Sequence, residues 1–179
     1  ERRLTASILY QLDFFKEERA SQDDICIIGL INNKRVKRYL DIKYLDLENT
    51  NLYKWKVLVP KSNGSGALGE VESTQIIVEP LTGYTQSFLG IGAFETEEEA
   101  QAAYKYVVSK FARTMLGVLK ITQDNPPEKW KYVPLQDFSS SSDIDWSQSI
   151  QSIDSQLYDK YGLSEEERNF IETHVKEMN

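Results

Sequence analysis

Two aspartates and a lysine have the spacing found in metal-dependent nucleases. Asp24 precedes Asp41-Ile42-Lys43, which gives the order acid, acid, any residue, lysine. In such a site the carboxylates bind Mg²⁺ and the group activates water for attack on a phosphodiester. A chain with 28 Asp and Glu residues also produces this spacing by chance. A Mg²⁺-dependent nuclease and a charged hairpin edge therefore both remain open.

Two short motifs are similar to parts of a nucleotide-modifying active site. Phe88-x-Gly90-x-Gly92 is similar to the glycine turn that holds S-adenosylmethionine, and Asn125-Pro126-Pro127-Glu128 to an NPP-aromatic motif that holds a flipped adenine. Glu128 cannot stack on a base. The acid that would bind the cofactor ribose, about 20 residues beyond the glycine turn, falls within a predicted helix. We therefore predict no cofactor site and no catalytic residue in this chain.

The lone cysteine and the lone histidine are both predicted to be structural. Cys26 lies in the apolar run 25–31, which is typical of a buried strand. His174 lies among apolar residues and is expected to be a partly buried packing residue, since no nucleophile motif accompanies it. One Cys and one His cannot form a zinc site.

Clustered cations and polar loop residues favour binding of DNA over catalysis. Arg35 and Lys37 are predicted on one face of a strand, with Arg38 on the other, although cations on an edge strand also prevent aggregation. Glycines in the loop after Lys61 would let backbone amides approach phosphates. The candidate DNA-binding residues are Lys34, Arg35, Lys37, Arg38, Lys61, Asn63, Gly64, Ser65, Tyr84, Gln86, Ser87, Lys110 and Arg113.

The elements that must position these residues indicate an α+β fold with a small mixed or antiparallel sheet. Apolar spacing predicts a helix over 1–24, and one long packing helix at about 96–120 that begins with a capping box. Alternation and turn residues predict a hairpin over 25–40. Further strands are predicted at 55–60, 75–78, 86–91 and 130–133. A serine-rich joint at 139–142 would separate a domain over 1–138 from a C-terminal helical hairpin over 139–179.

Composition and charge narrow the class of protein. The net charge of the whole chain, −7, by itself disfavours nucleic-acid binding. Residues 1–66 and 104–134 are each net positive, however, and could form one basic face. A single cysteine excludes an intrachain disulfide, and the longest apolar run is too short to span a bilayer. A cytoplasmic protein without a membrane partner is expected.

Several long segments carry a resemblance to a known family. They are WKVLVPKSNGSGALGE (55–70), TQSFLGIGAFETEEEA (85–100), YVVSKFARTMLGVLKITQD (106–124), WKYVPLQDF (130–138) and IDSQLYDKYGLSEEERNFIETHVKEM (153–178). Over residues 25–179 the chain resembles the C-terminal target-recognition region of bacterial restriction–modification enzymes, the type II adenine-specific DNA methyltransferase/endonucleases. The matched segments contain no catalytic motif, so no residue role is carried over.

The resemblance implies a domain that binds duplex DNA and directs a separate methyltransferase/endonuclease core to its target. It further implies that S-adenosylmethionine and Mg²⁺ belong to that core. One alternative is a protein–protein docking module of the same system, because the Ile, Leu, Tyr and Phe side chains of residues 147–178 must pack against either this domain or a partner protein. In this alternative the helix over 1–24 or the acidic C-terminal hairpin binds the catalytic part. The other alternative is the nuclease described above.

Overall fold

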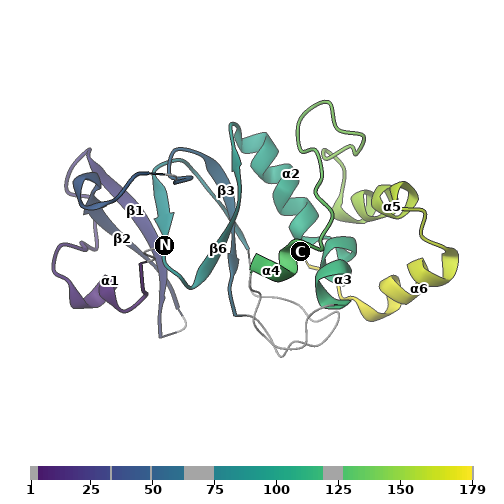
Figure 1. Ribbon diagram of the computed structural model, residues 1–179, viewed down its shortest axis with the longest axis horizontal. Coiled ribbons are helices and arrows are strands. Elements are labelled where there is room, and N and C mark those ends of the chain that lie inside the picture. Colours follow the sequence, from purple (N-terminus) through teal and green to yellow (C-terminus); the bar gives the residue numbers. More distant parts are fainter. Residues whose placement is uncertain (1–3, 33, 49, 63–74, 119–126, 179) are drawn as a thin grey trace.

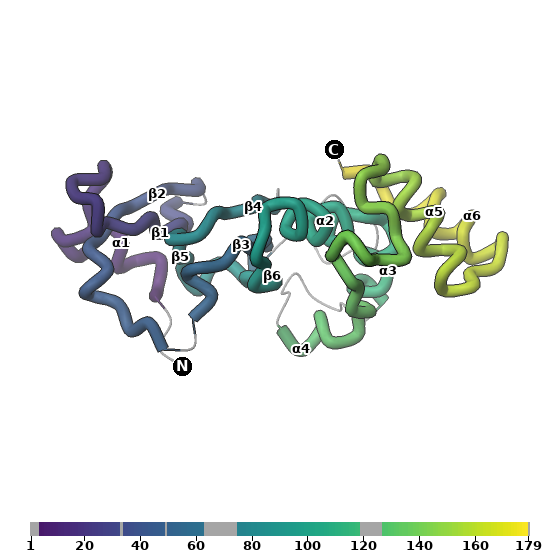
Figure 2. Tube along the Cα trace, turned by 90° about the horizontal axis from the view of Figure 1, so that it is seen from above, coloured from purple at the N-terminus to yellow at the C-terminus, as the bar shows by residue number. Residues whose placement is uncertain are grey.

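The computed structural model describes residues 4–32, 34–48, 50–62, 75–118 and 127–178. Two three-stranded sheets and a set of helices follow one another along the long axis of the molecule (Figures 1 and 2). The first sheet lies at one end, the second in the middle, and the C-terminal helices at the other end (Figure 1). The predicted α+β class is confirmed. No helix among the described residues is long and apolar enough to cross a membrane.

The first sheet has the strand order β2-β1-β5 and contains the predicted hairpin. β1 (Asp24–Ile31) pairs antiparallel with β2 (Lys34–Asp41). Asn32 turns the chain between them with φ 51°, which asparagine adopts more readily than most residues. The short β5 (Thr82–Tyr84) pairs parallel to β1 on its other side. β2 is therefore an edge strand.

β1 is apolar from Ile25 onward, and both of its faces are covered. Ile25 and Ile27 pack with Leu9 in one cluster, on the side of the short helix α1 (Ile8–Gln11). Cys26 and Ile28 pack on the opposite side, against the second sheet. The sequence predicts a buried strand here, and burial on both faces explains why its apolar run does not alternate.

The second sheet has the strand order β4-β3-β6. β3 (Trp55–Pro60) lies between β4 (Ile76–Val78) and β6 (Phe88–Phe94), and both pairings are antiparallel. Val57 and Val59 face α2 (Glu97–Val108), while Leu58 faces the first sheet. The strands predicted at 55–60, 75–78 and 86–91 are thus present, with shifted ends for β4 and β6.

Lys56 is fully buried in β3 without a carboxylate partner among the described residues. Its Nζ donates to the carbonyl oxygens of Asn51 at 2.9 Å and Lys54 at 2.8 Å. Burial lowers the pKa of this ammonium to about 8, against 10.5 in an unfolded chain. Between these two values the unfolded state binds more protons than the folded state, so stability should rise with pH there.

We expect the free energy of unfolding to increase between pH 8 and pH 10.5 by on the order of 1–3 kcal/mol through Lys56. Lys56→Met should remove this increase, since methionine has no proton to lose. Tyrosine ionisation affects both proteins alike, so the difference between them isolates the lysine. Urea unfolding at pH 7.5 and pH 10 measures it. An identical pH dependence in the two proteins would contradict this assignment.

Three predicted elements are wrong. In place of the helix expected over 1–24, the structure has only the short α1. The chain is extended at Lys16, where it pairs with the edge of β2: the amides of Lys16 and Tyr39 each donate to the other residue's carbonyl. The helix expected at 96–120 is broken at Ser109, whose φ of −61° and ψ of 151° are extended, so α3 (Lys110–Val118) is separate. Residues 130–133, expected to form a strand, are instead the end of the short helix α4 (Pro127–Trp130) and the turn after it.

The C-terminal helical hairpin is confirmed. α5 (Ile150–Lys160) and α6 (Glu165–His174) are joined at Gly162, whose φ is 65°, and Ser164 and Glu167 form the predicted capping box. Their apolar stripes pack against α2 and α3. The core consists of Ala102, Tyr106, Phe111, Ala112, Ile144, Trp146, Ile153, Leu157, Tyr158, Ile171 and Val175. It includes residues on both sides of the predicted joint.

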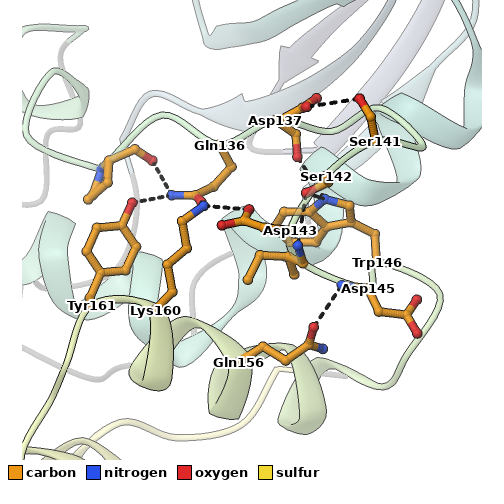
Figure 3. A network of polar contacts seen from close by, with 12 residues as sticks. Gln136, Asp137, Ser141, Ser142, Asp143, Asp145, Trp146, Gln156, Lys160 and Tyr161 are labelled. Carbon is orange, nitrogen blue, oxygen red and sulfur yellow. Dashed lines mark hydrogen bonds and ion pairs between the residues drawn. The ribbon is translucent and has the colours of Figure 1, made fainter.

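The serine-rich segment is held by hydrogen bonds (Figure 3). The indole Nε1 of Trp146 donates to the carbonyl of Asp137 at 2.8 Å and to Ser142 Oγ at 2.9 Å. The carboxylate of Asp137 accepts from the amide of Ser139 at 2.8 Å. Buried Gln136 donates to Tyr161 Oη at 2.7 Å. This segment therefore fastens the helical hairpin to the rest of the chain.

Candidate nucleic-acid interface

Three predicted binding segments meet around Phe88, at the start of β6. The guanidinium of Arg35 lies over the Phe88 ring, 5.8 Å from its centroid. The amide of Lys61 donates to the carbonyl of Ser87 at 2.9 Å. In the first sheet, Lys37 pairs with Ile28, which pairs in turn with Tyr84. Residues distant in sequence thus form one surface around the buried Phe88 ring, here called the Phe88 surface: Lys34, Arg35, Lys37, Lys61, Tyr84, Gln86 and Ser87.

The strand geometry determines which cations belong to this surface. Lys34, Arg35 and Lys37 are exposed on the edge strand β2. Arg35 and Lys37 share one face, as predicted from alternation, and this is the face toward the second sheet. Arg38 points to the opposite face, where its guanidinium pairs with the Glu17 carboxylate at 3.2 Å. Arg38 is therefore not counted in the Phe88 surface. Lys34 has the same alternation as Arg38, but it is exposed at the end of β2 beside the turn and is kept because its ammonium has no ion-pair partner among the described residues.

Much of the positive charge on the Phe88 surface is uncompensated. Among the described residues, no carboxylate lies within ion-pair distance of Lys34, Lys37 or Lys61. Other lysines contrast with them: Lys43 lies 2.7 Å from Asp41 and Lys160 lies 2.7 Å from Asp143. Unpaired surface ammonium groups attract a polyanion, because no intramolecular salt bridge must first be broken.

The polar residues of the 84–87 turn differ in accessibility. Gln86 is exposed, with its backbone amide bound to the Leu4 carbonyl at 2.7 Å, which leaves its side-chain amide at the surface. Tyr84 is half-buried, and its ring lies where a side chain on Gly90 would be. Gly92, with φ 79°, makes room in the same way for the Phe94 ring. The glycine motif therefore has a packing role in β6.

Lys110 and Arg113, predicted to bind DNA, are instead buried. The Nζ of Lys110 lies 2.6 Å from the Glu172 carboxylate. Arg113 donates from Nε to the carbonyl of Val108 at 3.2 Å, and also to the carbonyl of Lys176. These buried side chains connect α3 to α6 and to the segment that follows α6, so they are not part of an exposed basic surface. Asn63, Gly64 and Ser65, also predicted, lie outside the described residues, as do Asn125 and Pro126.

The two aspartates of the nuclease spacing are cross-strand partners, Asp24 opposite Asp41. Asp24 is buried and accepts from the amides of Ala20 at 2.8 Å and Ser21 at 3.0 Å, and these bonds lower its pKa. Hydrogen bonding to Lys43 lowers the pKa of Asp41. Within the described residues, no three acidic, His or Cys side chains are grouped to hold a metal. Both carboxylates thus have local structural partners.

The cysteine and the histidine are not part of the Phe88 surface, because Cys26 is buried beneath it and His174 lies on α6. Cys26 is buried as predicted, and burial raises the pKa of its thiol. His174 was expected to be partly buried but is exposed at the end of α6, where its ring stacks on Phe170 at 4.2 Å. The Nδ1 of His174 lies 2.9 Å from Thr173 Oγ1 and 2.8 Å from the Phe170 carbonyl oxygen, both within its own helix.

One cation near this surface is missing from the sequence-based set. The Arg19 guanidinium lies over the Tyr39 ring at 5.8 Å, on β2. No motif marks Arg19, because its position depends on the pairing of Lys16 with Tyr39. Comparison with protein-family models, curated proteins and solved structures finds no match.

Proposed function

We propose that this chain is a sequence-specific recognition domain for duplex DNA, which positions a separate methyltransferase/endonuclease core of a bacterial restriction–modification system. The observation that carries the proposal is the convergence of three distant segments on the Phe88 surface, with unpaired lysines from two of them. The family resemblance over 25–179 supports the same function and supplies the identity of the partner core.

In this proposal the lysines position the duplex and the neighbouring polar groups read it. Lys34, Lys37 and Lys61 bind phosphates, which gives affinity but no sequence information. Gln86 has the amide that pairs with adenine in the major groove, and Arg35 has the guanidinium that pairs with guanine. Methyl transfer and cleavage, with their S-adenosylmethionine and Mg²⁺, belong to the separate core.

The proposal is tested by fluorescence anisotropy of a labelled random-sequence duplex, measured from low to physiological salt. We expect saturable binding that weakens steeply with salt, reaching a Kd of roughly 10⁻⁴ to 10⁻⁶ M at physiological salt without the core. Preferred sequences can then be selected from a pool of duplexes. Absence of binding at low salt would refute the proposal.

A second candidate function is docking to the catalytic core. The tail no longer supports it, because its apolar stripe packs on α2 and α3. Exposed apolar side chains near α1 do: Phe14 and Tyr44 stack at 5.2 Å and both remain accessible, as does Tyr10. Clustered exposed aromatics are typical of protein interfaces. Failure to bind DNA at low salt would favour this candidate.

A further inference from the structure

Three cations, Arg35, Lys37 and Arg19, lie in a row along one face of β2. Arg35, Lys37 and Tyr39 alternate along the strand and therefore point to the same side. Arg35 stacks over Phe88 at one end, and Arg19 stacks over Tyr39 at the other. Lys37 lies between them. The row thus extends the Phe88 surface beyond the residues that the sequence indicated.

The Tyr39 ring, rather than a carboxylate, holds Arg19 in this row. The segment that carries Arg19 is fixed by the two backbone hydrogen bonds between Lys16 and Tyr39, at 2.8 and 2.9 Å. Arg19 is exposed, and no carboxylate among the described residues lies within ion-pair distance of it. Such a stacked guanidinium keeps its donors available for an anion.

Arg168 provides the contrasting case. It lies over the Tyr158 ring at 6.0 Å, but its guanidinium also pairs with the Asp159 carboxylate at 2.8 Å. Stacking on tyrosine is therefore common to both arginines, but the Arg168 guanidinium is also held by this ion pair and by a hydrogen bond from its Nε to the Leu163 carbonyl at 2.9 Å. Lys37 and Tyr39 share one face of β2 by alternation, so Arg19, which lies over the Tyr39 ring, is on the same side as Lys37. Burial raises the pKa of the nearby Cys26 thiol, on which Arg19, Lys37 and the Glu79 carboxylate all act electrostatically.

The spacing of the row matches a nucleic-acid backbone. Same-face residues of an antiparallel strand repeat about every 6.8 Å, from a rise of about 3.4 Å per residue. Each strand of B-form DNA carries one charge per roughly 3.4 Å of axis. Because the backbone winds around this axis, neighbouring phosphates are farther apart in space than the axial rise, so cations about 6.8 Å apart on β2 can contact phosphates of one strand.

We propose that this face of β2 binds the sugar–phosphate backbone of one strand of a DNA duplex, with Arg19 as a phosphate contact at the end of the row. This inference rests on the proposed DNA-binding function. It adds a positioning residue contributed by the segment before β1, so the N-terminal segment takes part in binding and does not only cover the core.

The test compares the salt dependence of duplex binding for the wild type, Arg19→Gln and Arg168→Gln. Losing one phosphate contact should reduce the slope of log K against log salt by about 0.9 and weaken binding about eightfold at 0.1 M salt. Arg168→Gln, which removes a stacked but paired arginine, should match the wild type. Both sites are at the surface, and thermal unfolding verifies that the variants fold.

An unchanged slope for Arg19→Gln, with the wild type binding normally, would overturn the role of Arg19 and leave the DNA-binding function intact. An equal reduction in both variants would also overturn it, because the effect would then reflect net charge rather than a contact. Absence of wild-type binding would refute the proposed function itself and this inference with it.

Discussion

Replacing Asp154 with alanine is expected to lower the free energy of unfolding by about 2–4 kcal/mol, because it leaves two buried amides without acceptors. The Asp154 carboxylate, on α5, accepts from the amides of Lys110 at 3.1 Å and Phe111 at 2.8 Å, at the first turn of α3. The side chain is buried, which raises its pKa to about 6, so it is ionised at pH 7. A negative charge at a helix N-terminus is itself favourable.

Asp159→Ala, in the same helix, is the matched control. Asp159 has an exposed side chain whose ion pair with Arg168 is at the surface, so its loss should cost less than about 1 kcal/mol. Urea unfolding followed by circular dichroism at pH 7 measures both variants. A loss for Asp154→Ala no larger than that of the control would show that the two amides do not depend on this carboxylate.

Neutralising the unpaired lysines is expected to have the largest effect on DNA binding. Changing Lys34, Lys37 and Lys61 together to alanine should weaken duplex binding by roughly 500-fold at 0.1 M salt and reduce the salt slope by about 2.7, if each contacts one phosphate. Stability should change little, because none of the three has an ion-pair partner among the described residues.

The control for this triple variant changes Lys43, Lys54 and Lys160 to alanine. Each of these lysines pairs with a carboxylate, those of Asp41, Glu95 and Asp143 respectively. Both triple variants remove the same formal charge, so a general effect of net charge would weaken binding equally in each. Equal loss in anisotropy titrations would therefore contradict the assignment of binding to the Phe88 surface.

Locally determined parts of the fold are predictable from the sequence. The β1–β2 hairpin follows from an apolar run, an Asn32 turn and an alternating strand, and the start of α6 follows from the Ser164 and Glu167 box. The break at Ser109 could not be predicted in this way. Ser109 caps α3 itself, but Asp154, far along the chain, satisfies two further amides and stabilises a second helix start.

The candidate site was predictable only in part, for the same reason. Alternation placed Arg35 and Lys37 on one face, but their contact with the 84–88 segment depends on how the two sheets pack. Helical periodicity alone predicted Lys110 on the solvent-exposed side of its helix. In the structure α6 covers that side and supplies the Glu172 carboxylate that pairs with Lys110. Arg19 was missed because its stacking on Tyr39 follows from a bridge between distant backbone segments.

Photo-crosslinking of the full chain to a duplex, with the linked peptides identified by mass spectrometry, tests the central claim most directly. The Phe88 surface predicts crosslinks in β2 and in the segment 84–88, with few in α5 and α6. These crosslinks should disappear in the Lys34, Lys37 and Lys61 triple variant and persist in its control. Crosslinks confined to the helices at the other end of the molecule would contradict the claim that the Phe88 surface binds DNA.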